Sequence, residues 1–236
     1  MTTHYGADQS LALLREGYRW GGRVCDAAGA DAVRVRLLGR PALLVRGDCA
    51  ARDFYGNPDL IRRGAMPLRL RTTLVGFGAV QGMDGEEHRH RKAMLLGVLN
   101  REGEDSLVQT FGRLLRARLP QWETASRVRL AGEFGLLLTV AAYDWAGVPL
   151  PSAGLHWRLQ DAMVTSPARV GPGHWRGIAA RVALERWLGR LVRETRRGGD
   201  GFRPGSPARD VAHYRQPNGR PLAAPFVAVE LLNLLR

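Results

Sequence analysis

The sequence of 236 residues has little cysteine and no long apolar run. Its two cysteines, Cys25 and Cys49, cannot build a disulfide framework. A membrane-spanning helix needs about 18 or more consecutive apolar residues, and no such stretch occurs. The first residues, Met1 to Ser10, are polar and lack the apolar core of a secretory signal. Together these absences predict a protein without a membrane span in a reducing, cytoplasmic setting.

Lysine is nearly absent as well. The basic residues are 34 arginines and a single lysine, Lys92, and the formal net charge is +13. The arginines are scattered from Arg15 to Arg236, whereas a nucleic-acid-binding protein usually concentrates its charge in a patch or tail. We therefore expect no nucleic-acid partner. The alternative to an enzyme is a basic helical protein that binds nucleic acid or another anion without catalysing a reaction.

Hydrophobic periodicity predicts a mainly α-helical chain with a small β-sheet near the N-terminus. Val33 to Leu38 alternates apolar and polar side chains, and a turn at Gly39–Pro41 pairs it with Ala42 to Val45 in a hairpin. In the first predicted helix, Leu11, Leu14 and Tyr18 share an apolar face. Helices are predicted over 10–20, 48–55, 84–99, 106–119, 133–145, 157–164, 174–196, 210–214 and 225–236.

Three end signals accompany these helices. Asp48 is a candidate cap of the helix over 48–55. Asp84 and Glu87 have the spacing of a capping box at the start of the helix over 84–99. Pro120 is expected to end the helix over 106–119.

Motifs of nucleophilic catalysis and of nucleotide binding are lacking. The chain has no Gly-x-Ser-x-Gly, no phosphate-binding Walker loop and no dinucleotide glycine pattern after a strand. Cys25 and Cys49 are interpreted as ordinary small apolar residues. If the protein is an enzyme, its reaction must depend on residues other than a nucleophile motif, a nucleotide-binding loop or these two cysteines.

The strongest cluster of polar side chains is at residues 81–92, Gln-Gly-Met-Asp-Gly-Glu-Glu-His-Arg-His-Arg-Lys. His88 and Lys92 are four positions apart and share one face near the start of a predicted helix, where backbone N–H groups favour anions. This face predicts a bound carboxylate or phosphate, which Arg62 could also contact. Spacing alone still favours a solvated charged face. No metal site is expected, because His88 and His90 point away from each other and no cluster of further ligands accompanies them.

Arg236 ends the apolar helix predicted over 225–236. A buried guanidinium needs a partner, and bidentate pairing with a carboxylate suits it best. Glu230, six positions earlier, is not the obvious helical partner, and Arg236 could instead end in solvent. Because the apolar helix stops without a cap or polar tail, we expect the chain to be the front part of a longer protein.

Several segments closely resemble bacterial fatty-acid peroxygenases, a branch of the cytochrome P-450 superfamily that uses hydrogen peroxide. The resembling segments, in the family's order, are Leu13–Tyr18, Arg36–Gly39, Gln81–Lys92, Ala146–Leu150, Val170–Trp175 and Glu230–Arg236. The resemblance spans nearly the whole chain but only about the first half of the family's length. It implies the superfamily's prism-shaped α+β fold, truncated, with residues 1–236 as the N-terminal part of a single domain.

The resemblance also implies roles for individual residues. His88 and Lys92 match positions that face the propionates of haem b, and Arg62 matches a basic residue at the same propionates. Gln81 matches a distal-side residue near the haem edge. Arg236 matches the arginine that holds the substrate carboxylate above the iron. In this family the fatty acid's own carboxylate takes the acid–base role in hydroxylation or decarboxylation.

The family's iron ligand has no counterpart in this sequence. It is a cysteine thiolate in a glycine-rich loop far toward the C-terminus, and Cys25 and Cys49 match no ligand position. The resemblance therefore implies that the chain holds only half of a haem pocket and contributes no metal ligand. A non-catalytic carrier of fatty acid or haem is a third hypothesis, against which we count the uncovered apolar helix expected over 226–236.

Overall fold

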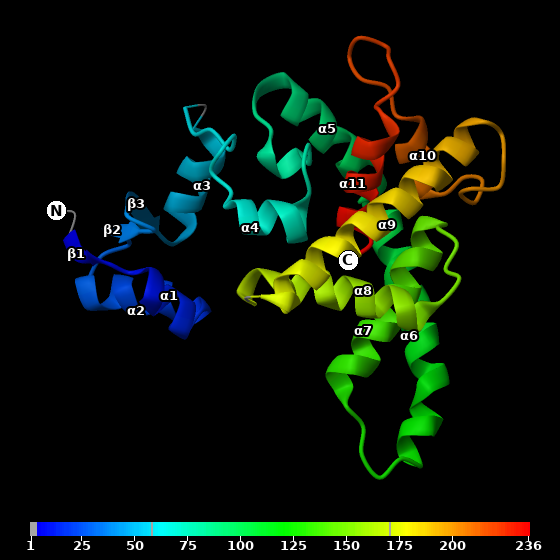
Figure 1. Ribbon diagram of the computed structural model, residues 1–236, viewed down its shortest axis with the longest axis horizontal. Coiled ribbons are helices and arrows are strands. Elements are labelled where there is room, and N and C mark those ends of the chain that lie inside the picture. Colours follow the sequence, from blue (N-terminus) through cyan, green and yellow to red (C-terminus); the bar gives the residue numbers. More distant parts are fainter. Residues whose placement is uncertain (1–3, 58, 170) are drawn as a thin grey trace. The chain divides into compact units, whose positions relative to one another are not determined.

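A computed structural model describes residues 4–57, 59–169 and 171–236 (Figure 1). The chain divides into two compact units, Met1–Ile61 and Arg62–Arg236, and each has its own hydrophobic core. Val170, which begins one of the resembling segments, lies outside the described residues. That residues 1–236 belong to a single domain stays a prediction.

The first unit holds a three-stranded sheet and short helices. Its elements are β1 (His4–Asp8), α1 (Ser10–Glu16), α2 (Tyr18–Ala28), β2 (Ala32–Leu37), β3 (Arg40–Val45) and α3 (Asp48–Gly56). The strand order is β1-β2-β3, with β1 parallel and β3 antiparallel to β2. The predicted hairpin is confirmed, but its turn is Leu38–Gly39, where φ is 51° and 72°. Strand β1 was not predicted.

The helix predicted over 10–20 is two helices. Gly17 has φ 57°, a left-handed conformation that separates α1 from α2. The predicted shared face is wrong, because Leu11 and Leu14 lie on α1 and Tyr18 begins α2, and all three side chains are exposed. The burial is supplied by α2 and the sheet instead, through Trp20, Val24, Cys25, Val33 and Val35.

Helix α3 confirms the prediction over 48–55 but not its cap. Gly47 occupies the N-cap position, and Asp48 is the first helical residue. Cys49 is exposed on this helix, whereas Cys25 is buried in the core of the first unit.

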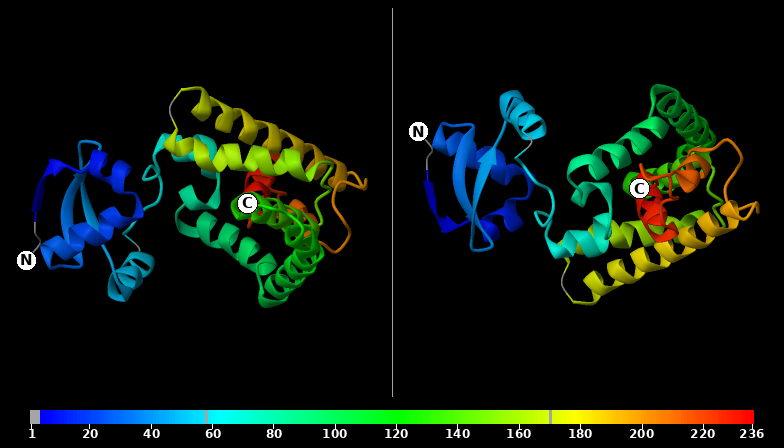
Figure 2. Two further views of the ribbon diagram at one scale, coloured as in Figure 1. Left: turned by 90° about the horizontal axis from the view of Figure 1, so that it is seen from below. Right: turned by 90° about the horizontal axis from the view of Figure 1, so that it is seen from above.

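The second unit is almost entirely helical. Its elements are α4 (Leu68–Leu70), the π-helical turn η1 (Arg71–Val75), the 3₁₀ turn η2 (Val80–Gly82), α5 (Gly85–Val98), α6 (Arg101–Glu123), α7 (Leu130–Ala146), α8 (Ala153–Thr165), the 3₁₀ turn η3 (Ser166–Ala168), α9 (Pro172–Arg196), α10 (Pro207–His213) and α11 (Ala224–Leu234). Helix α6 continues past Pro120, contrary to prediction, because a proline in the last turn removes only one hydrogen bond near the helix end. Helices α8 and α9 pack side by side (Figure 2).

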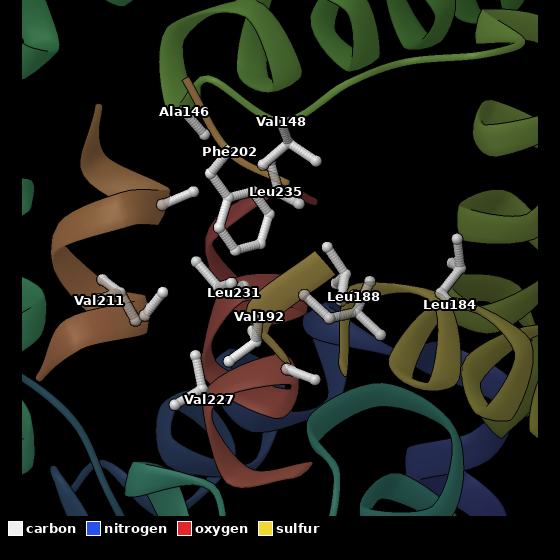
Figure 3. Packing of buried hydrophobic residues seen from close by; sticks show 14 of the residues in the cluster. Ala146, Val148, Leu184, Leu188, Val192, Phe202, Val211, Val227, Leu231 and Leu235 are labelled. Carbon is white, nitrogen blue, oxygen red and sulfur yellow. The ribbon is translucent and has the colours of Figure 1, made fainter. Parts of the chain in front are cut away.

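Helix α11 lies at the centre of this unit's core. Side chains from α7, α9, α10 and α11 interdigitate around Phe202, Leu188, Leu231 and Leu235 (Figure 3). Val227 and Leu232 are also fully buried, so the expectation of an uncovered apolar helix over 226–236 is wrong. Helices α9 and α10 pack against α11, which is why its apolar side chains are buried.

The fold class is confirmed. Most of the described residues are helical, and the described sheet is small and lies near the N-terminus. Across the described ranges, no helix is both long and apolar enough to cross a membrane.

Candidate functional site

Asp84 connects the start of α5 to the segment that carries Arg62. Its carboxylate accepts hydrogen bonds from the backbone N–H groups of Arg62 (2.7 Å) and Arg63 (2.9 Å). These two bonds lower the pKa of Asp84. Asp84 occupies the N-cap position of α5 but makes no side-chain bond to the helix, so the predicted capping box is wrong. The carboxylate that sequence spacing assigns to the helix is used to hold the preceding loop.

His88, Lys92 and Arg62 form a group of neighbouring basic side chains, which we call the α5 cation group. His88 is half-buried and Lys92 is exposed. Burial, followed by the charges of Arg62 and Lys92, lowers the pKa of His88, and Asp84 opposes this shift. The lowered pKa favours the neutral form of His88 at pH 7, and beside it the group presents Lys92 and Arg62, whose Nη1 lies 4.0 Å from Asp84 Oδ1. An anion placed here gains from both charges and from the start of α5.

A buried ion pair joins α5 to α11. Arg91 Nη1 lies 3.1 Å from Glu230 Oε1, and their side chains are 3 % and 0 % exposed. The same carboxylate oxygen accepts the Val80 N–H at 2.9 Å. Burial raises the pKa of Glu230, while Arg91 acts in the opposite direction. This pair fixes the turn η2 and both helices against one another.

Gln81 lies on η2, one residue after the N–H that Glu230 holds, and is exposed. The structure therefore places Gln81 on an anchored turn between α5 and α11. Its predicted place near a haem edge stays a prediction.

The carbonyl groups that end η1 collect several donors. Arg181 of α9 donates to Leu74 O at 2.6 Å and to Val75 O at 2.7 Å. Asn233 of α11 donates to Val75 O at 3.0 Å. The C-terminal carbonyls of a helix have no intrahelical partner, so these side chains satisfy them.

Arg236 also reaches this end of η1. It follows α11, and its Nη1 donates to Leu74 O. Burial, followed by repulsion from Arg181, lowers the pKa of Arg236 to about 10, so it remains a cation at neutral pH. Glu230, which sequence spacing set aside as a partner, pairs with Arg91 instead. Arg236 thus has a carbonyl partner, and no side-chain carboxylate pairs with it among the residues described.

The residues present fit the acidic edge of haem b but not its iron. The α5 cation group offers the charges that two propionates require. Cys25 is buried in the core of the first unit, and Cys49 is on α3 of that unit. Within the described part of the chain, no three His, Cys, Asp or Glu side chains gather as a metal site. The family's thiolate ligand, which the resemblance places outside this sequence, has no counterpart in this donor set.

A cavity of about 80 Å³ adjoins Arg62, Arg71, Val75 and Met83. This volume holds a few water molecules and is far too small for a porphyrin.

Sequence reasoning missed the contacts of Arg91, Arg181 and Asn233, and it found no partner for Glu230. The one available signal was Glu230, a lone acid in the apolar stretch of α11. A charge at such a position needs a buried partner, but the sequence does not say which arginine supplies it.

Solved structures resemble the chain over nearly all of its length, although no protein-family model matches it. A variant of cytochrome P450SP alpha (CYP152B1) is 36 % identical with a TM-score of 0.91, over 98 % of this chain and 57 % of that one. A variant of cytochrome P450 OleT in complex with arachidonic acid is 26 % identical, with a TM-score of 0.92, over 100 % and 57 %. Cytochrome P450EX alpha (CYP152N1) with myristic acid is 28 % identical, with a TM-score of 0.86, over the same shares.

The chain thus spans a little over half the length of the solved proteins that it matches. The ordered segments, the mainly α fold and these similarities agree with one another. The chain belongs to the CYP152 branch of the cytochrome P450 superfamily, the fatty-acid peroxygenases, and corresponds to the N-terminal part of that fold.

Proposed function

We propose that this chain is the N-terminal part of a cytoplasmic haem-thiolate enzyme that hydroxylates or decarboxylates fatty acids with hydrogen peroxide. The observation that carries the proposal is the similarity, along 98 % or more of the chain, to CYP152 proteins, two of them solved with arachidonic and myristic acid. The haem-ligand segment lies beyond residue 236 in this proposal.

The α5 cation group is proposed to hold the haem propionates. Lys92 and Arg62 supply charge, and neutral His88 supplies a ring N–H. When bound, haem would supply iron for cleavage of the peroxide O–O bond. Gln81, on its anchored turn, is proposed to lie at the distal edge.

Arg236 is proposed to bind the fatty-acid carboxylate. Its guanidinium can exchange the Leu74 carbonyl for a charged acceptor, which makes the stronger, bidentate hydrogen bonds. A carboxylate fixed there accepts a proton from one peroxide oxygen and returns it to the other. The chain's contribution to this step is orientation, because Arg236 supplies no proton at pH 7.

A haem titration of the purified chain, followed by the reduced carbon-monoxide difference spectrum, tests the cofactor part. We expect weak uptake without a thiolate-type Soret band, and weaker uptake in Lys92→Gln than in Arg89→Gln, which removes an equal charge from the same helix. A thiolate-type band would mean that Cys25 or Cys49 ligates iron. Equal uptake by the two variants would contradict the propionate role of Lys92.

The reading frame after codon 236 tests the remainder. We expect it to encode a cysteine in a glycine-rich loop, and a frame without one would contradict the peroxygenase activity. A nucleic-acid or anion-binding protein without catalysis is not favoured. It predicts DNA affinity that falls steeply with salt, which a filter-binding series at several salt concentrations would detect.

A further inference from the structure

Two guanidinium groups converge on a single backbone oxygen in the second unit. Leu74 O accepts Nη1 of Arg181 at 2.6 Å and also Nη1 of Arg236. Arg181 is buried and Arg236 is exposed, and two like charges that share one neutral acceptor repel each other. The two arginines differ in the other contacts that hold them.

Arg181 is held rigidly. It is 2 % exposed, and its two terminal nitrogens bond to Leu74 O and Val75 O while Nε bonds to Glu185 Oε1 at 2.6 Å. Gly76 makes this approach possible, since a Cβ there would lie 2.2 Å from Arg181 Nη2. Every part of the Arg181 fork thus has a partner inside the protein.

Arg236 has a replaceable partner. If its guanidinium leaves Leu74 O, that oxygen keeps its bond to Arg181. Turning Arg236 toward a ligand therefore leaves no buried carbonyl without a donor, and the usual penalty for such a group is avoided. The bond from Arg181 therefore lowers the free-energy cost of moving Arg236 away from Leu74 O.

The charges favour an anion as the replacement. Three charged groups act on Arg181, namely Glu185 of α9, Glu230 of α11 and Arg236. Glu185 bonds to Arg181, and Glu230 bonds to Arg91. Arg181 repels Arg236, and no side-chain carboxylate pairs with Arg236 among the described residues. A bound carboxylate would offset this repulsion and supply the missing partner.

We propose that Arg181 is a positioning residue that makes the Arg236 site specific for a carboxylate over an uncharged head group. It frees Arg236 from Leu74 O and adds a second positive charge beside it. This inference rests on the proposed function, in which Arg236 binds the fatty-acid carboxylate.

The test measures binding of decanoate and of 1-decanol, which have equal chain lengths, to the full chain by calorimetry. We expect Arg236→Gln to weaken decanoate binding about tenfold or more, as loss of a charged hydrogen bond does. Arg181→Gln should weaken it about three- to tenfold and leave 1-decanol unchanged, because only the anion feels the lost charge. Arg190→Gln, an exposed arginine on the same helix, is the charge-matched control and should change neither.

Two further measurements separate specificity from folding. Arg181→Lys keeps the charge and should retain most of the preference for decanoate even if the glutamine variant folds poorly. Removing the Arg181 charge should also raise the pKa of Arg236, so the loss of decanoate binding at high pH moves upward in Arg181→Gln and stays in place in Arg190→Gln. If Arg181 has a purely structural role, the pH at which decanoate binding is lost should be the same in Arg181→Gln, in Arg190→Gln and in the unchanged chain.

The outcomes separate the carboxylate role of Arg236 from the positioning role of Arg181. Unchanged decanoate binding in Arg236→Gln overturns the proposed carboxylate role and this inference with it. If Arg236→Gln loses binding but Arg181→Gln loses decanoate and 1-decanol equally, or behaves as Arg190→Gln, the inference alone is overturned.

Discussion

Arg91 and Lys92 are consecutive cations on α5 with opposite surroundings. Arg91 is 3 % exposed and bonds to Glu230 at 3.1 Å. Lys92 is exposed, and no carboxylate pairs with it within the part of the chain that the structure describes. A buried charge must be paired for the protein to fold, whereas an exposed one is solvated and remains available. Burial therefore separates charges that hold the fold from charges available to a ligand, even one residue apart.

The largest effect is expected from breaking the buried pair. Arg91→Met should lower the free energy of unfolding by about 3–5 kcal/mol, because Glu230 is then buried without its cation. Urea denaturation followed by tryptophan fluorescence measures this loss.

A double variant that removes both charges tests whether the loss comes from the unpaired Glu230 carboxylate. Arg91→Met with Glu230→Leu should recover most of the stability, since two apolar side chains need no ionic partner. Arg89→Met, at an exposed neighbouring position, is the control and should change little. Equal losses at positions 89 and 91 would mean that the buried pair does not contribute as described.

Gly76→Ala is expected to have the next largest effect, because it crowds the other buried arginine, Arg181. The new Cβ would lie 2.2 Å from Arg181 Nη2 and 2.8 Å from Val229 Cγ1, at a residue with φ 93°. Overlap and backbone strain should together lower the unfolding free energy by about 2–4 kcal/mol. Gly64→Ala separates the two causes, because Gly64 has φ 80° with open space around it. If both alanines lower the melting temperature equally, the close approach of Arg181 is unimportant.

The sequence predicted local features of this site better than its long-range contacts. Helices α5, α9 and α11 follow from periodicity, as does the shared face of His88 and Lys92. Periodicity assigns a face to each side chain but not the element that covers it. Arg181 is therefore not predictable, because its acceptor, Leu74, is 107 residues away.

Asp84 shows the same limit at shorter range. Its position before a helix predicts a cap, yet its carboxylate bonds to the N–H groups of Arg62 and Arg63, about twenty residues earlier. Only the path of the loop decides between these two uses, and a loop path leaves no periodic signal.

A smaller effect is expected from acid titration of Asp84. Its two backbone hydrogen bonds lower its pKa in the folded state. A lowered pKa stabilises the fold above the unfolded-state value, and this stability is lost as pH falls through the folded-state value. Melting temperatures between pH 6 and pH 3, chosen to bracket the usual aspartate pKa of about 3.9, should fall less steeply in Asp84→Asn than in the unchanged chain. Asp59→Asn, at an exposed aspartate, should keep the original slope.

The smallest effect on stability at pH 7 is expected from His88 and Lys92 of the α5 cation group, because Lys92 is exposed and His88 is only half-buried. At pH 7, His88→Gln and Lys92→Gln should each change the unfolding free energy by less than about 0.5 kcal/mol. His88 should nevertheless give a pH dependence, because burial, Arg62 and Lys92 lower its pKa in the folded state. The unfolded chain then binds the proton more readily, so stability falls as pH drops below about 6.5.

His88→Gln should remove this slope, and Lys92→Gln should reduce it by removing one repelling charge. His90→Gln is the matched control, since His90 is exposed on the same helix and lies 3.5 Å from Glu86. Thermal unfolding between pH 7.5 and pH 5, a range chosen around the usual histidine pKa of about 6.5, measures all three slopes. A slope that persists in His88→Gln would mean that another group produces it. Loss of the slope in His88→Gln, a reduced slope in Lys92→Gln and an unchanged slope in His90→Gln would together show that the neighbouring cations act on His88.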